Sequence, residues 1–140
     1  MPTRILVIED NPANMELMTY LLKAHGYALL TATDGESGLA VATEELPELI
    51  ICDVHLPQLD GYGVVRVLKR TPALSGIPAI AVTALAMVGD REKLIEAGFD
   101  GYLSKPIEPE TFISEIERFL PEIARFPQRT VEPGAGRTTR

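Results

Sequence analysis

The sequence is poor in cysteine, tryptophan and basic side chains: its 140 residues include one Cys, no Trp, and 13 Lys and Arg against 20 Asp and Glu. Because Cys52 has no second cysteine to pair with, no disulfide can form within the chain, and a cytoplasmic location is expected. The net charge of -7 disfavours a domain that binds nucleic-acid phosphates or anionic lipid. No apolar run approaches the length of a membrane span, and the amino terminus does not have the form of a signal peptide. We therefore expect no direct nucleic-acid partner and no membrane association.

Apolar residues make up 46% of the chain and fall into five short runs separated by segments with helical spacing. The runs are residues 5–8, 28–32, 49–54, 79–82 and 101–103. Continuous apolar runs that alternate with helices predict an α/β fold, in which a five-stranded parallel sheet is covered by helices on both faces. The periodicity ends near Leu120, so we expect one domain over residues 1–120 and a flexible C-terminal tail over residues 121–140.

Polar side chains follow four of the five apolar runs. Glu9 and Asp10 close the first run, Asp53 closes the third, Thr83 the fourth and Lys105 the fifth. Because the carboxyl ends of parallel strands meet at one edge of the sheet, where ligands of such folds bind, these side chains should converge.

Three carboxylates in one partly desolvated cleft repel one another, so a cation is expected among them. Mg²⁺ is the natural candidate, because it prefers oxygen ligands and works with one or two carboxylates plus a phosphate. Lys105 and Thr83 could contact phosphate oxygens, and Asp53 could accept a phosphoryl group as an aspartyl phosphate. The set therefore predicts phosphoryl chemistry.

Four stretches of the sequence together resemble the receiver domain of two-component response regulators. They are residues 5–12, residues 51–57 with Asp60-Gly61, residues 81–84 and residues 98–106. The resemblance covers roughly Thr3 to Leu120 and implies a flavodoxin-like sheet with strand order 2-1-3-4-5.

The resemblance also implies a function. Asp53 would accept a phosphoryl group from a sensor histidine kinase or a histidine phosphotransfer protein, and the domain would switch conformation to signal to a downstream protein in a phosphorelay. Such a domain is a signalling phosphoacceptor rather than an enzyme, since it catalyses only its own phosphorylation and dephosphorylation. A phosphorylation-dependent homodimer is a further partner that the resemblance allows.

Metal ligands carry over from the family by position. Asp10 and Asp53 would bind Mg²⁺ together with the backbone carbonyl of His55, while Glu9 would act through a metal-bound water. The imidazole of His55 could also lie near the phosphate and alter the phosphoryl lifetime.

Phosphate and switch residues carry over in the same way. Lys105 and Thr83 would contact the phosphate, and Tyr102 would follow Thr83 as the domain switches. The bond between Lys105 and Pro106 is expected to be cis, as it is in the family.

Two surfaces are candidates for protein contacts by the same resemblance. Met15 and Met18 on the first helix could belong to the core or could meet the phosphodonor, and adaptable Met side chains suit such a docking face. Residues 86–88 near the start of the fourth helix, with Ile107, would form part of the output face.

Two alternatives stay open from the residues. A phosphatase of the haloacid dehalogenase type also uses Asp, Mg²⁺, Thr and Lys, but it places its nucleophile after the first strand. A pseudo-receiver would bind partners without phosphorylation, although it would be expected to lack at least one of the site residues. The resemblance fits both a free-standing regulator and a receiver from a hybrid kinase.

Overall fold

The computed structural model describes residues 2–84 and 89–121, which form a sheet of five parallel strands in the order β2-β1-β3-β4-β5. The strands are β1 (Arg4–Ile8), β2 (Ala28–Ala32), β3 (Leu49–Asp53), β4 (Ala79–Thr83) and β5 (Gly101–Ser104). The helices are α1 (Pro12–Ala24), α2 (Gly35–Glu45), α3 (Gly61–Arg70), α4 (Asp90–Ala97) and α5 (Pro109–Glu117). The predicted strand order is confirmed, and the tail beyond residue 121 lies outside the described residues.

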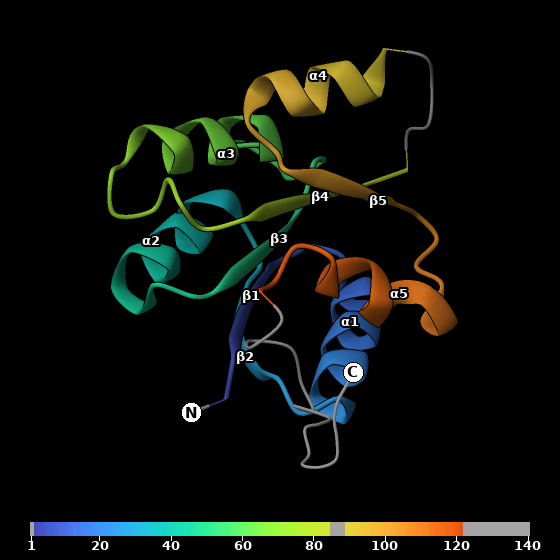
Figure 1. Cartoon of the computed structure of the whole chain (residues 1–140). Coiled ribbons are helices and arrows are strands. Elements are labelled where there is room, and N and C mark those ends of the chain that lie inside the picture. Colours follow the sequence, from blue (N-terminus) through green and yellow to red (C-terminus); the bar gives the residue numbers. More distant parts are fainter. Residues whose placement is uncertain (1, 85–88, 122–140) are drawn as a thin grey trace.

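Helices cover both faces of the sheet, with α1 and α5 on one side and α2, α3 and α4 on the other (Figure 1). Side chains of one strand alternate between two apolar clusters, so Leu6 and Ile8 pack in the layer of α2 and α3, while Ile5 and Val7 pack in the layer of α1 and α5. The three central strands are buried on both faces, as expected for a parallel sheet between helices.

Helix ends follow the polar and breaking residues of the sequence. The side chains of Asn11, Asp34 and Asp60 cap α1, α2 and α3 by accepting hydrogen bonds from backbone amides three residues later. Helix α2 ends at Leu46, which adopts a left-handed conformation with φ of 50° ahead of Pro47. Local capping therefore sets where each of these helices meets the sheet.

Two residues of the predicted interaction surfaces lie in the core. Met18 is 1% exposed and packs among the residues beneath α1 and α5, and Ile107 is 7% exposed in the same cluster. Of the two predicted roles of Met18, the structure shows the core role, and the prediction that Ile107 lies on an exposed output face was wrong because its apolar surface is used in folding. Met15 is half-buried, and residues 86–88 lie outside the described residues.

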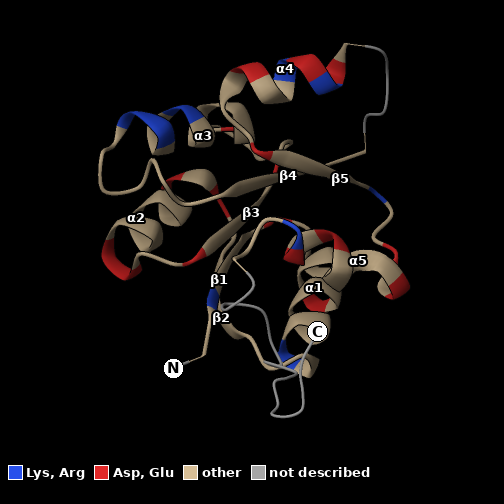
Figure 2. Cartoon of the chain, viewed as in Figure 1, with Lys and Arg blue, Asp and Glu red and all other residues tan. Residues whose placement is uncertain are grey.

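Basic residues lie in the second half of α3, acidic residues lie at the end of α2, and α4 carries both basic and acidic residues (Figure 2). Within the described residues, no helix combines the length and the apolar character that crossing a bilayer requires.

Candidate functional site

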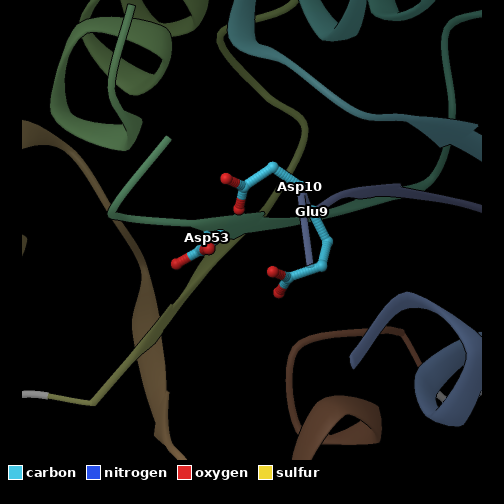
Figure 3. A group of neighbouring side chains, drawn as sticks. All are labelled: Glu9, Asp10 and Asp53. Carbon is cyan, nitrogen blue, oxygen red and sulfur yellow. The ribbon is translucent and has the colours of Figure 1, made fainter. Parts of the chain in front are cut away.

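Three carboxylates gather where β1 and β3 end, as Figure 3 shows for Glu9, Asp10 and Asp53. One carboxylate oxygen of each lies within 4.8 Å of those of the other two. Parallel pairing brings them together. Ile8 lies opposite Cys52, so Glu9, the residue after β1, lies beside Asp53. The predicted convergence of these residues is confirmed.

Glu9 is the most deeply buried of the three carboxylates, with 0% of its surface exposed. Its Oε2 accepts a hydrogen bond of 3.1 Å from the amide of Asn11, whereas its Oε1 is buried without a hydrogen-bond partner among the described residues. Burial, reinforced by the nearby charge of Asp53, raises the pKa of Glu9 from 4.5 to about 7. An unpartnered buried carboxylate oxygen fits a site that receives a cation or its water shell.

Lys105 joins two of the carboxylates. Its Nζ lies 3.3 Å from Asp53 Oδ2 and 3.7 Å from Glu9 Oε2, on a side chain that is 19% exposed. The backbone supports this position, since the amide of Lys105 donates to the carbonyl of Thr83 and the bond to Pro106 is cis, as predicted. One ammonium does not balance the three carboxyl groups of the cluster, so the site favours a further cation.

Asp53 is 2% exposed and is fixed at both oxygens. The amide of His55 donates to Oδ1 at 3.1 Å, and Lys105 approaches Oδ2. Asp10 is exposed, so one side of the cluster is open to solvent and to a donor molecule. The carboxylate of Asp53 is thus held in one orientation beside an exposed carboxylate.

Thr83 and Tyr102 lie on neighbouring strands. Thr83 is 2% exposed at the end of β4 and pairs in register with Ser104, whereas Tyr102 is 39% exposed on β5. Asp53 pairs in register with Val82, so Thr83, the next residue of β4, lies at the same edge of the sheet. Tyr102 lies on the edge strand with part of its surface exposed. Their predicted movement together stays a prediction.

Two backbone contacts of the site were not anticipated from the sequence. Glu9 and Asp53 each accept a hydrogen bond from the amide two residues later, Asn11 and His55 respectively. Asp side chains commonly accept this hydrogen bond in turns, so the position of Asp53 at the end of a strand could have predicted the contact with His55. Cys52, the residue before Asp53, is buried, and burial raises the pKa of its thiol.

The chain matches known proteins over most of its length. The family model of the response regulator receiver domain matches residues 5–117. The polar-differentiation response regulator DivK of Brucella anthropi is 41% identical over 120 residues, which are 86% of this chain and 98% of that protein.

Solved structures agree with this match. The chemotaxis protein CheY4 of Vibrio cholerae is 26% identical with a TM-score of 0.81, over 86% of this chain and 100% of that one. The receiver domain of the sensor histidine kinase PA1611 from Pseudomonas aeruginosa, with a magnesium ion in its active-site cleft, is 33% identical with a TM-score of 0.78, over 85% of this chain and 98% of that one. The chain belongs to the family of response regulator receiver domains, the signalling modules of phosphorelays.

Proposed function

We propose that this receiver domain is a Mg²⁺-dependent phosphoacceptor and that Asp53 receives the phosphoryl group. The observation that carries the proposal is the placement of Asp53, whose carboxylate is held by Lys105 and by the amide of His55 beside two further carboxylates. The family assignment sets the phosphatase alternative aside, and the complete set of site residues argues against a pseudo-receiver.

Asp10, Asp53 and the backbone carbonyl of His55 are the residues that would hold Mg²⁺, with Glu9 acting through a water. Their oxygen atoms are the ligands that Mg²⁺ prefers, and the unpartnered Oε1 of Glu9 suits a water of its hydration shell. When bound, Mg²⁺ supplies positive charge that neutralises the phosphoryl oxygens.

The phosphodonor would be a phosphohistidine of a sensor histidine kinase or of a histidine phosphotransfer protein. An oxygen of Asp53 attacks phosphorus, the bond from phosphorus to the imidazole nitrogen breaks, and the freed nitrogen takes a proton from solvent. Lys105, 3.3 Å from Asp53 Oδ2, is within reach of a phosphoryl oxygen on that carboxylate and stabilises its charge. Attack by water later returns Asp53 and releases inorganic phosphate.

The output is a change of conformation read by a downstream protein. Thr83, buried beside the site, would donate its hydroxyl to a phosphoryl oxygen, and Tyr102 on the next strand would move with it. The two states are populated according to their difference in free energy, which phosphorylation changes. A homodimer of phosphorylated chains is a second way in which the signal could be passed.

Intact-mass measurement after incubation with Mg²⁺ and acetyl phosphate tests this function. Wild type should gain one phosphate adduct that is lost with chelator, and Asp53→Asn should gain none, because the amide is a poor nucleophile. The matched control is Asp34→Asn, since Asn caps helix α2 as well as Asp does. An adduct on Asp53→Asn, or an adduct in wild type that is indifferent to chelator, would contradict the proposal.

A further inference from the structure

The first residue of α3 packs directly on the backbone of the strand that carries Asp53. A methyl group at Gly61 would lie 2.7 Å from the carbonyl oxygen of Asp53 and 2.7 Å from the Cα atom of Val54. Both distances are far below van der Waals contact, and both neighbours are main-chain atoms that cannot rotate away. Only a residue without a side chain fits between α3 and this segment.

Hydrogen bonds hold the same segment from two sides. The amide of Gly61 donates to the carbonyl of Val54 at 2.9 Å, and the amide of Val54 donates to the carbonyl of Val82 on β4 at 3.0 Å. The next residue, His55, donates its amide to Asp53 Oδ1 at 3.1 Å. The backbone from Asp53 to His55 is therefore held between α3 and β4, and the hydrogen bond from His55 also fixes the carboxylate of Asp53.

Gly63 provides a contrast within the same helical turn. A methyl group there would lie 2.5 Å from Leu59 Cδ1, the tip of a flexible and half-buried side chain. The backbone of α3 is helical at both glycines, so Ala suits the local conformation at either position and favours the helix similarly. The two positions differ in what the methyl group displaces: the main chain of Asp53 and Val54 in one case, a rotatable side chain in the other.

We propose that Gly61 is a positioning residue for the Mg²⁺ site, because its missing side chain sets where Asp53 and the carbonyl of His55 stand relative to Asp10. The inference rests on the proposed function, since it concerns the same metal site. A methyl group 2.7 Å from these main-chain atoms requires α3 and the backbone of Asp53 and Val54 to move apart by a few tenths of an ångström. Ligand distances in metal sites lie within about 0.2 Å of their standard values, so a shift of this size is enough to disturb the ligands.

The test compares full-length Gly61→Ala and Gly63→Ala in an NMR titration of backbone amides with Mg²⁺. This readout reports on folded molecules, so a loss of stability alone would not change the dissociation constant. Gly61→Ala should weaken Mg²⁺ binding about tenfold or more, as removal of supporting groups around a metal does, while Gly63→Ala should bind as wild type does. Equal dissociation constants for Gly61→Ala and wild type would overturn the inference, whereas absence of Mg²⁺ binding by wild type would overturn the proposed function itself.

A second measurement on wild type decides the matter if Gly61→Ala does not fold. Coupling is reciprocal, so a contact that positions the metal ligands must itself be stabilised by Mg²⁺. Hydrogen exchange of the Gly61 amide, bonded to Val54, should slow with Mg²⁺ by a larger factor than exchange of the Gly63 amide, bonded to Asp60 Oδ1. Equal slowing of the two amides would overturn the inference.

Discussion

At the scale of single residues, the site depends on carboxylates that are costly to keep charged. Glu9 is buried, one of its oxygens has no hydrogen-bond partner in the described part of the chain, and Lys105 lies 3.7 Å from the other oxygen. Desolvation outweighs this attraction, which is why the pKa of Glu9 rises to about 7 rather than falling. Ionisation of the buried Glu9 lowers the stability of the fold, and it places a negative charge where a cation would bind.

The raised pKa of Glu9 predicts a dependence of stability on pH. The folded state holds the Glu9 proton more tightly than the unfolded state, so in chelated buffer this residue's contribution to the free energy of unfolding falls as pH rises from 4.5 to about 7. Urea unfolding of wild type and Glu9→Gln across this range should show the difference, at most about 3 kcal/mol. Glu16→Gln, at an exposed position, should keep the wild-type profile. Identical pH profiles for Glu9→Gln and wild type would contradict the shift.

Individual site residues were predictable because they stand where strands end. Asp53, Thr83 and Lys105 each follow an apolar run, and parallel pairing brings the ends of such runs together. Backbone contacts to the carboxylates were harder to predict, since they depend on the path of the loop after each strand. The lack of room for a side chain at Gly61 can be seen only once α3 is packed against the end of β3.

At the scale of elements, a clamp joins α3, β4 and β5 at the edge of the sheet opposite the site. The ammonium of Lys69 lies 3.2 Å from Asp100 Oδ2 and donates to the carbonyls of Ser75 and Ile77, at 3.3 and 3.1 Å. Asp100 Oδ2 also accepts from the amide of Ala79 at 2.8 Å. One cation therefore ties the loop after α3 to the starts of both strands.

Removing this cation should destabilise the fold without affecting the site. Lys69→Met keeps an unbranched side chain but loses the ammonium that donates to three oxygen atoms. The free energy of unfolding should therefore fall by about 1 to 3 kcal/mol in urea denaturation. Mg²⁺ affinity should not change, because the clamp lies at the amino ends of β4 and β5. Lys93→Met, at an exposed position on α4, is the control and should cost less than about 0.5 kcal/mol. A loss no larger than that of the control would show that the clamp is not stabilising.

Element boundaries were predictable where a local residue sets them, and less so elsewhere. The capping side chains and the stop at Leu46 follow from short-range chemistry, and the strands are within one residue of their predicted ends. Helix α4 begins at Asp90, after Gly89 in a left-handed conformation that makes no side-chain cap hydrogen bond. Met18 and Ile107 were candidates for contact faces by the resemblance alone, and their burial became visible only in the packed structure.

At the scale of the whole molecule, topology makes the site. Glu9, Asp53 and Lys105 are separated by dozens of residues, yet the order β2-β1-β3-β4-β5 delivers them to one edge. Alternation of apolar runs and helices predicted a parallel sheet covered by helices on both faces, whereas the strand order was implied by the resemblance to receiver domains. Burial of the cluster, and hence its electrostatics, emerged only from the packed structure.

Mapping the residue that carries the phosphoryl group is the most direct test of whether Asp53 is the phosphoacceptor. Wild type is incubated with Mg²⁺ and acetyl phosphate, treated with borohydride, which reduces an acyl phosphate to an alcohol, and digested for peptide mass mapping. We expect a homoserine at position 53, formed only when Mg²⁺ is present. Reduction at another carboxylate, including Glu9 or Asp10, or an adduct that borohydride leaves intact, would contradict this expectation.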